Sequence, residues 1–264
     1  MRPVALLTDF GLEDHYAGVL HAVLVREAPG ADRLDISHGV PPGDLWTACF
    51  LLRAAWPHLP ADAVALVVVD PGVGTDRRAV AVRVGDRFLV GPDNGLAAAV
   101  GEATDAVELD PGIMGIPEPS ATFHGRDLFA PAAARLARGD SPAGLGGPLD
   151  PGTLVSCPIP APERAGDTVR GVVQHVDRFG NLVTNLPVGT VPPEAELRVG
   201  WRRITRVVRT YGDAPEGEVV LLEGSSGYLE ISVVGGSAAH ALGLAPGDPV
   251  DAVVPPAVHP PRDS

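Results

Sequence analysis

Polar loops in the first half of the chain hold side chains that could do chemistry on a small molecule. Asp70 follows an unbroken apolar run, residues 63–69, and precedes the turn Pro-Gly-Val-Gly. Such a run is typical of a strand buried on both faces, and ligands in open α/β sheets bind beyond the carboxyl ends of the strands. The turn's glycines would let the backbone approach a ligand closely. Asp70 is therefore a candidate for acid–base chemistry, although an aspartate that only caps a turn would show the same pattern.

Three further polar loops interrupt apolar segments in the same half of the chain. They are residues 8–11, which contain Asp9, residues 92–95, which contain Asn94, and residues 122–127, which contain His124. A carboxylate or an imidazole can accept a proton from water. These residue types therefore point to activation of a water molecule.

We expect no metal site. Cys49 and Cys157 lack the spacing of zinc ligands. The alternative is a metal-dependent hydrolase, because carboxylate-rich loops can coordinate Mg²⁺. Its ligands would be Asp9, Asp70, Asp93 and His124. Arg77 near this cluster would compete with a cation.

The surrounding elements predict two domains. Strand and helix patterns alternate along the chain, and this alternation is typical of a parallel sheet. These patterns cover residues 3–7, 13–26, 33–37, 44–56 and 63–67, followed by a hairpin at 78–90 and a helix at 127–138. We predict an α/β N-terminal domain, residues 1–158, with a largely parallel central sheet.

The rest of the chain lacks this alternation of strand and helix patterns. Proline-rich residues 159–166 are predicted to be a linker. Short strands separated by Gly and Pro turns then predict a smaller all-β, barrel-like C-terminal domain, residues 167–264. The expected strands are residues 168–176, 182–186, 196–208, 218–222, 228–234 and 250–254.

Composition excludes several classes of partner. The net charge of −13 argues against nucleic acid, which requires a basic surface, and is compatible with a small cationic substrate. No apolar run reaches the roughly 20 residues of a membrane span. The first residues lack the apolar region of a signal peptide, so we expect a cytoplasmic protein with no membrane partner.

Six polar motifs in order along the chain resemble the S-adenosyl-L-methionine (SAM) hydroxide adenosyltransferases, relatives of fluorinase and chlorinase. Besides the four loops above, the motifs are residues 177–185 and 224–228. The resemblance implies a SAM hydrolase: water or hydroxide attacks the ribose C5′ in line and displaces L-methionine, leaving adenosine. It also implies no cofactor and a homotrimer with sites at subunit interfaces.

The family's catalytic trio falls on Asp70, Arg77 and His124, although Arg78 is adjacent to Arg77. Water is a weak nucleophile that must be aligned and partly deprotonated, and either Asp70 or His124 could be the base. Arg77 would fix the carboxylate or offer positive charge to hydroxide.

The resemblance also assigns substrate contacts. Asp9 aligns with the ribose ligand, and an ionised carboxylate can accept from both hydroxyls of a diol. Phe179 would stack on adenine, and Ser225 and Ser226 would contact the methionine carboxylate. The remaining candidates are Tyr16, Val73, Asn94, Thr122, Phe123, Asp177, Asn181, Tyr228, Glu230 and Val233. Without ligand binding, Phe179 and Tyr228 would be barrel core and Asn181 a turn former.

Two departures from the halogenating relatives favour hydrolysis. Gly125 replaces a serine that helps to hold halide, and Asp70 replaces a tyrosine. A carboxylate would repel halide but can organise water. The alternatives left open are a SAM or nucleoside sensor without catalysis and a halide-using enzyme.

Overall fold

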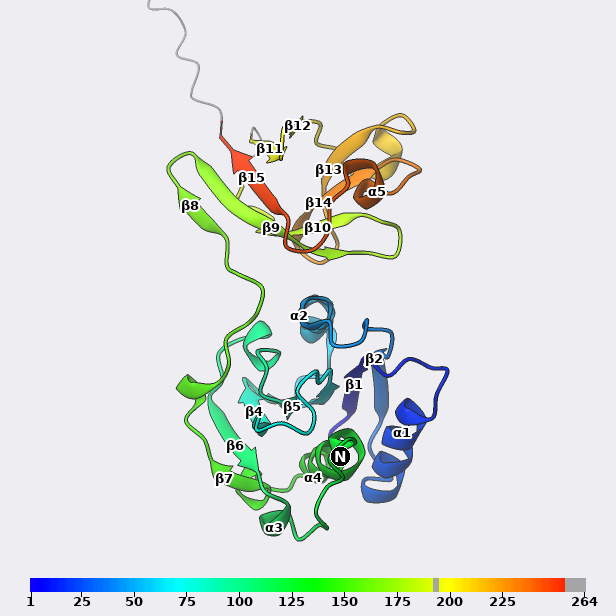
Figure 1. The fold of residues 1–264 in the computed structure, drawn as a ribbon, viewed down its shortest axis with the longest axis vertical. Helices are drawn as coiled ribbons and strands as arrows, with labels where there is room; N and C mark the ends of the chain where they lie inside the picture. The colour runs from blue at the N-terminus through cyan, green and yellow to red at the C-terminus, as the bar shows by residue number, and fades with distance from the viewer. Residues whose placement is uncertain (192–194, 255–264) are drawn as a thin grey trace, which may run out of the picture. The chain divides into compact units, whose positions relative to one another are not determined.

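The structure is a computed structural model that describes residues 1–191 and 195–254 (Figure 1). The chain divides into two compact units, Met1–Pro158 and Ile159–Ser264, each with its own hydrophobic core. Each unit is described by itself below.

The first unit is built on a mixed seven-stranded sheet with the order β2-β1-β3-β5-β4-β6-β7. The pairs β2–β1, β1–β3 and β3–β5 are parallel, and β5–β4, β4–β6 and β6–β7 are antiparallel. The strands are β1 Val4–Thr8, β2 Arg33–Ser37, β3 Val64–Val68, β4 Ala79–Val84, β5 Arg87–Pro92, β6 Asp105–Leu109 and β7 Gly146–Pro148. The prediction of a largely parallel sheet is therefore wrong. The β4–β5 hairpin reverses chain direction, and the strands added beyond it continue antiparallel.

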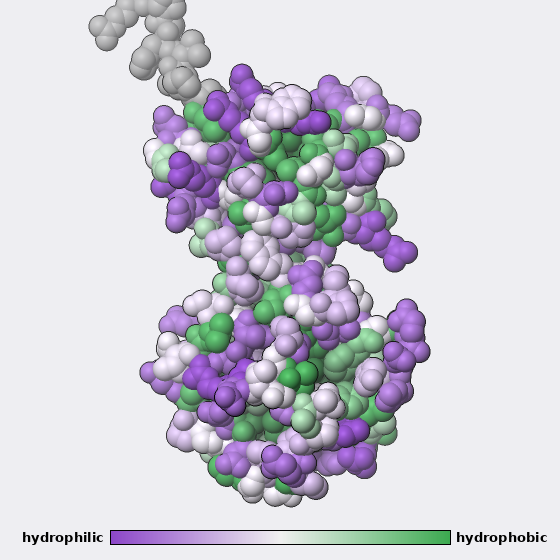
Figure 2. All heavy atoms as spheres, in the orientation of Figure 1, coloured by the Kyte–Doolittle hydropathy of each residue, from purple (hydrophilic) through white to green (hydrophobic). Residues whose placement is uncertain are grey.

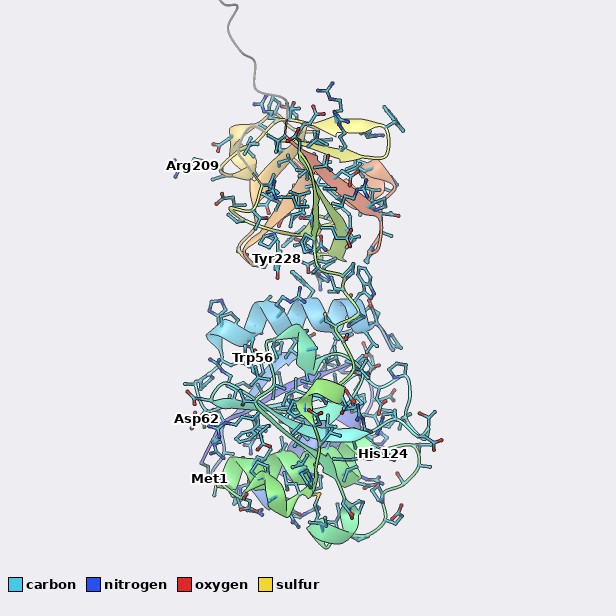
Figure 3. The ribbon with its side chains drawn as sticks, turned by 90° about the vertical axis from the view of Figure 1, so that its left-hand side faces the viewer. Met1, Trp56, Asp62, His124, Arg209 and Tyr228 are labelled. Carbon is cyan, nitrogen blue, oxygen red and sulfur yellow. The ribbon has the colours of Figure 1, made fainter. Side chains whose placement is uncertain are left out.

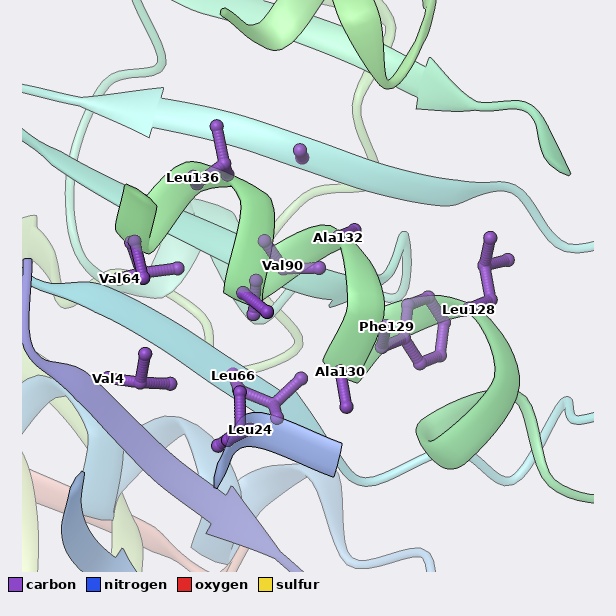
Figure 4. Close-up of a cluster of buried hydrophobic side chains, with 14 of the residues drawn as sticks. Val4, Leu24, Val64, Leu66, Val90, Leu128, Phe129, Ala130, Ala132 and Leu136 are labelled. Carbon is purple, nitrogen blue, oxygen red and sulfur yellow. The ribbon is translucent and has the colours of Figure 1, made fainter. Parts of the chain in front are cut away.

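Helices cover this sheet because its central strands are apolar on both faces. Every residue of β1 and β3 is buried. Helix α4 (Ala130–Arg138) packs on β1, β3 and β5 and also contacts α1 (Tyr16–Glu27). Figure 4 shows alternate strand residues, including Val4, Val64 and Leu66, facing α4 and α1. Helix α2 (Leu45–Ala55) lies across the sheet from α4 (Figure 1), and Asp44 caps its first turn through the amides of Trp46 and Thr47.

The strand order places a topological switch point between β1 and β3. The chain passes from β1 to β2 on one side and then to β3 on the other, so the two crossovers leave in opposite directions. Ligands of open α/β sheets bind at such a point, outside the carboxyl ends of the strands. Asp9 follows β1 and Asp70 follows β3 closely, so both lie at this edge.

Short helical turns complete the first unit. Helix α3 is Pro111–Met114, and Gly125–Phe129 forms one π-helical turn that leads directly into α4. The predicted helix 127–138 is thus a π turn followed by an α-helix, and the helix predicted at 13–26 begins only at Tyr16. A π turn widens the helix by one residue and often occurs at functional sites. Here it directly follows His124.

The second unit is a barrel-like sheet with the order β12-β11-β15-β9-β10-β14-β13, and β8 pairs with β9. Its elements are β8 Glu163–Ala165, β9 Thr168–Val176, β10 Leu182–Pro187, β11 Glu196–Val199, β12 Arg202–Ile204, β13 Val219–Glu223, β14 Tyr228–Val233, α5 Ala238–Leu242 and β15 Pro249–Val253. Residues 206–208 hydrogen-bond to β13 at Leu221, which brings the two ends of the sheet together.

Two parts of the second unit differ from the expected strands. The segment expected as one strand at 196–208 is instead a hairpin of β11 and β12. The φ of +57° at Gly200 permits the turn between them, since glycine adopts positive φ without steric cost. Residues 163–165, in the segment predicted as a linker, pair with β9 as β8. The prediction for residues 255–264 lies outside the described part of the chain.

Hydrophilic and hydrophobic side chains are interspersed on the face of both units drawn in Figure 2. Within residues 1–191 and 195–254, no helix has the length and apolar character needed to cross a membrane.

Candidate functional site

Asp70 and Arg77 form a buried ion pair at the end of β3. The Arg77 Nε lies 3.0 Å from Asp70 Oδ1 and 3.1 Å from Oδ2, and Nη2 also donates to Oδ2. The two side chains are 7% and 12% exposed, respectively. A forked pair of this kind fixes the orientation of the carboxylate plane. Oδ1, which accepts from Nε alone, still has a lone pair that can accept from a water molecule.

Arg77 also contacts His124, which comes from a separate loop. The Arg77 Nη2 lies 2.8 Å from His124 Nδ1. A guanidinium only donates, so Nδ1 must accept, and the neutral imidazole must carry its proton on Nε2. Burial, and next the positive charge of Arg77, lower the pKa of His124. His124 is therefore held neutral as an Nε2–H donor.

The neighbouring arginine serves a different carboxylate. Arg78 Nε lies 2.9 Å from Asp93 Oδ2, and Asp93 Oδ1 accepts from the amide of Val155 at 2.9 Å. Arg77 is thus the guanidinium that pairs with Asp70. Asp93 is therefore bound by Arg78 and Val155, and in the described part of the chain Asp9, Asp70, Asp93 and His124 do not form a group that could hold a metal ion.

A cavity of about 210 Å³ lies beside the ion pair. It is lined by Asp9, Phe10, Tyr16, Val68, Asp70, Val73, Thr122, Phe123, His124 and Gly125. Nine site residues of the first unit were predicted from the sequence. Seven of them line this cavity: Asp9, Tyr16, Asp70, Val73, Thr122, Phe123 and His124. Arg77 does not line the cavity but bonds to two residues that do, Asp70 and His124. Asn94 does not line it either. Its side chain donates to the carbonyl of Val69 at 2.8 Å and so supports the backbone next to Asp70.

Aromatic rings form one wall of this cavity. The Phe10 ring centroid lies 5.8 Å from those of both Tyr16 and Phe123, and the Tyr16 and Phe123 centroids are 5.3 Å apart. Their tilted and edge-to-face arrangements are those that aromatic rings prefer. Phe10, which sequence reasoning did not single out, is one residue past Asp9 and completes this wall.

Asp9 is anchored by one of its two oxygens. Its Oδ2 accepts from the amide of Gly43 at 2.8 Å, and Gly43 has a φ of +71°. Burial raises the pKa of the Asp9 carboxyl, and the hydrogen bond from Gly43 opposes this shift. The anchor leaves Oδ1 available to accept from a ligand hydroxyl.

Two glycines let the loops around the cavity approach closely. Gly74 has a φ of +79°, and a Cβ there would lie 3.0 Å from the carbonyl oxygen of Ala121. A Cβ on Gly125 would lie 3.3 Å from the Phe10 ring and 3.4 Å from both Phe123 and Val68. A side chain at either position would change the shape of the cavity.

The second unit holds a larger cavity of about 810 Å³. It is lined by Asp177, Phe179, Asn181, Tyr211, Leu222, Glu223, Gly224, Ser225, Glu230, Val233, Gly235 and Gly236. Asp177, Phe179, Asn181, Ser225, Glu230 and Val233 were predicted from the sequence; Ser226 and Tyr228 do not line the cavity. His124 of the first unit and Tyr228 of the second are labelled in Figure 3.

Asp177 organises the loop that carries Phe179. Its Oδ1 accepts from the amides of Phe179 and Asn181, both at 2.9 Å, and its Oδ2 accepts from the Asn181 side chain at 2.9 Å. The Phe179 side chain is left 78% exposed, so it is not part of the barrel core. An aromatic ring held in this way is suited to stacking on a planar ligand.

Sequence reasoning missed Tyr211, which lies outside the six motifs. Its hydroxyl donates to Glu230 Oε1 at 2.7 Å, and Ser232 donates to the same oxygen at 2.8 Å. Burial and this bond raise the pKa of Tyr211 to about 12, so the phenol stays protonated as a donor. With Asp177 and Glu223, Glu230 gives the cavity three carboxylates, which suit a cationic ligand.

Comparisons with known proteins identify the family. Residues 4–146 match the SAM hydroxide adenosyltransferase N-terminal domain, and residues 171–251 match the C-terminal domain of the same family. A curated relative from Thermus thermophilus, named (R)-S-adenosyl-L-methionine hydrolase, is 47% identical over 263 residues, which are 95% of this chain and 99% of the relative. A fluorinase from Actinoplanes sp. is 25% identical, over 87% of this chain and 90% of its own length.

A solved structure has the same fold. An uncharacterized conserved protein from Thermotoga maritima superposes with a TM-score of 0.86 at 35% identity, covering 95% of this chain and 99% of that one. Because both family domains match in order along one chain, the protein belongs to the SAM hydroxide adenosyltransferase family.

Proposed function

We propose that this protein hydrolyses SAM to adenosine and L-methionine. The observation that carries the proposal is the Asp70–Arg77–His124 constellation beside a cavity that also contains Asp9. The family membership and the hydrolase name of the Thermus thermophilus relative support the same reaction.

In this mechanism a water molecule attacks the ribose C5′ in line with the C–S bond. The new C–O bond forms as the C–S bond breaks, and the electron pair leaves with sulfur as the neutral thioether of methionine. The sulfonium therefore needs no protonation to depart. The water proton passes to an acceptor and then to solvent, and general-base help of this kind is worth roughly 10²–10⁴-fold.

The hydrogen bonds favour Asp70 as that acceptor. The lone pair on His124 Nδ1 already accepts from Arg77, and Nε2 carries a proton. His124 would instead donate from Nε2 to the oxygen of the attacking water. Arg77 would hold the carboxylate and the imidazole in one geometry, which aligns the nucleophile.

Substrate recognition divides between the two cavities. Asp9 Oδ1 would accept from the ribose diol, next to the aromatic wall of Phe10, Tyr16 and Phe123. Phe179 would stack on adenine, with about 1–3 kcal/mol from such stacking. The carboxylates of the second-unit cavity would favour the ammonium group of the substrate, and Ser225 would contact its carboxylate.

We further propose that the enzyme needs no cofactor, is a cytoplasmic homotrimer, and forms each site from the first unit of one subunit and the second unit of a neighbour. The support for the trimer is the family resemblance together with the division of the predicted contacts between two units. Turnover should persist in excess chelator, since the guanidinium of Arg77 already provides the positive charge beside Asp70 and would compete with a cation there.

Product analysis in ¹⁸O-labelled water tests the reaction. The purified enzyme is incubated with SAM, with and without excess chloride or fluoride. The products are then separated by liquid chromatography, and their masses are measured by mass spectrometry. Adenosine labelled at its 5′-hydroxyl, in equal yield with methionine, is expected under all conditions. A 5′-halogenated nucleoside would identify a halide-using enzyme, and binding without any product would identify a sensor.

The variant Asp70→Asn tests whether Asp70 is the proton acceptor, because it preserves the shape of the side chain and removes its charge. Adenosine release should fall at least about a hundredfold, the low end of general-base help. SAM binding, measured by calorimetry, should be largely retained. Unchanged turnover in this variant would contradict the role of Asp70.

A further inference from the structure

Two histidines and an aspartate outside both cavities converge at β2, the edge strand of the first-unit sheet. His21 is on α1, Asp35 is on β2, and His38 directly follows β2. Helix α1 and strand β2 lie side by side (Figure 1). In each of these three side chains, one atom that could bind a metal lies within 4.8 Å of the corresponding atoms of the other two. Among the residues that the structure describes, no other group of three or more His, Cys, Asp or Glu side chains meets this condition.

Two of the distances within this group are close to those of a metal coordination shell. His21 Nε2 lies 2.9 Å and His38 Nε2 lies 3.2 Å from the same oxygen, Asp35 Oδ1. Around tetrahedral zinc, with metal–ligand bonds of about 2.0–2.2 Å, neighbouring ligand atoms are roughly 3.3 Å apart. A zinc ion could therefore enter with small movements of the three side chains.

His38 supplies an independent indication of a ligand. Its side chain is 4% exposed, and its Nε2 is buried without a hydrogen-bond partner in the described part of the chain. The 3.2 Å approach to Asp35 lacks hydrogen-bond geometry, although it brings the two atoms close. A buried imidazole nitrogen that lies 3.2 Å from a carboxylate oxygen without a hydrogen bond, in one group with a second imidazole, is the arrangement expected of a metal ligand.

The other ring nitrogen of His38 is anchored as in metal sites. His38 Nδ1 lies 2.8 Å from the hydroxyl of Thr8. Metal-binding histidines almost always donate their second ring nitrogen to a fixed acceptor, which sets the tautomer and the ring orientation. With its proton on Nδ1, His38 would present the Nε2 lone pair to the metal.

We propose that His21, Asp35 and His38 bind one Zn²⁺ ion. Two imidazoles and one carboxylate suit zinc, whereas Mg²⁺ and Ca²⁺ prefer oxygen ligands alone. The Asp35 side chain is 50% exposed, so water can complete a tetrahedral shell on that side. The ion would join α1 to β2 and, through His38 and Thr8, to the strand end that precedes Asp9. This proposal does not rest on the proposed function.

Zinc titration of the full-length, untagged, chelator-dialysed protein tests the site. Calorimetry should show one equivalent of zinc per chain, and Mg²⁺ at the same concentration should not bind there. The melting temperature should rise with zinc. Co²⁺ should give the visible absorption of a tetrahedral complex.

Variants tie this binding to the cluster. Asp35→Asn changes a half-exposed side chain with little change of shape, and it and His21→Ala should weaken zinc binding by at least about a hundredfold. Thr8→Val, which removes the anchor of His38, should weaken it by about 10–100-fold. His58→Ala is the control, since His58 is exposed in the same unit and outside the cluster.

Either of two results would overturn the proposal. One is the absence of saturable zinc binding to the wild-type protein, which would leave a metal-free His–Asp–His cluster. The other is equal zinc affinity in the wild-type protein and Asp35→Asn, which would place bound zinc elsewhere. The melting temperature of each variant without zinc shows that it is folded.

Discussion

Arg77 is the residue that organises the candidate catalytic centre. It donates to Asp70 and to His124, and its guanidinium carbon lies 5.2 Å from the centre of the Phe129 ring. Because arginine donates only, this one contact determines which nitrogen of His124 carries the proton. The choice of base, open from residue types alone, thus becomes a question of hydrogen-bond direction.

The pH dependence of turnover should report on His124. Its pKa is lowered below 6.5 by burial and by Arg77, so the neutral form persists at neutral pH. Protonation of Nδ1 would place a donor against the Arg77 donor and break the contact. We expect kcat to be constant above pH 6.5 and to fall as the pH drops through the lowered pKa. Stability should change in the same direction, because the folded state holds this proton less tightly than the unfolded state.

His124→Asn separates this titration from others. The asparagine oxygen can still accept from Arg77 but does not titrate near neutrality. The variant should be slower, and its kcat should lose the acidic decline. If the wild type and the variant show the same decline, the titrating group is another one, and Asp9, whose pKa is raised by burial, is the candidate.

Gly125 should be required for the cavity to admit the substrate. A Cβ at this position would lie 3.3–3.4 Å from Phe10, Phe123 and Val68. Gly125→Ser adds a hydroxymethyl group there, so kcat/KM should fall by about tenfold to a hundredfold through misplacement of the substrate. Gly144→Ser is the control, because a Cβ at Gly144 meets nothing within 4 Å. Equal kcat/KM in both variants would show that the cavity is wider than described.

At the scale of elements, the switch point between β1 and β3 explains why residues far apart in sequence share one cavity. Asp9 and Asp70 follow parallel, adjacent strands, so their side chains emerge at the same edge. The loop of residues 122–124 reaches that edge from the start of the π turn before α4. The geometry of the site therefore depends on how tightly these loops approach.

Gly74→Ala tests this dependence on loop approach. The φ of Gly74 is +79° and its Cβ would lie 3.0 Å from the Ala121 carbonyl, so the loop of residues 70–77 must shift. We expect kcat to fall by about tenfold or more, as small misplacements of catalytic groups cost that much. Gly85→Ala is a matched control with a φ of +60° and nothing within 4 Å.

Both glycine variants carry the cost of a left-handed backbone, about 1–2 kcal/mol. Both melting temperatures should therefore fall, and that of Gly74→Ala somewhat further, because its Cβ also meets the Ala121 carbonyl. Loss of kcat in Gly74→Ala alone would assign the effect to the loop contact. Equal losses of kcat in the two variants would assign it to general destabilisation and contradict the prediction.

At the scale of the whole molecule, the proposed intersubunit site predicts complementation. Asp70→Ala disables the first unit, and Phe179→Ala disables the second without loss of core packing, since Phe179 is 78% exposed. The co-expressed population, which contains mixed trimers and both homotrimers, should recover up to about one quarter of wild-type turnover. Each site would take each half from an intact subunit with a chance of about one half.

Separately purified variants, mixed without subunit exchange, are the control and should show no more turnover than the sum of the two variants measured alone. Light scattering gives the oligomeric state of each sample. Failure of the co-expressed variants to recover any turnover would show that both halves of a site come from one subunit, and a monomeric wild type would exclude the trimer.

Much of this arrangement was predictable from the sequence because it is local. The apolar run before Asp70 predicts a strand buried on both faces, and β3 is buried throughout. Asp44 predicts the start of α2, whose first amides it caps. Motif order alone indicated the family. These features depend on near neighbours in the chain, so periodicity, turn chemistry and spacing report them.

Other features were decided only by tertiary structure. The choice of Arg77 over Arg78, the direction of the Arg77–His124 bond, and the contact of Tyr211 with Glu230 join residues from separate elements. The same holds for the His21–Asp35–His38 cluster and for the antiparallel half of the sheet. Which side chains meet across elements depends on strand order and on the packing of helices over the sheet, and no local pattern in the sequence encodes these.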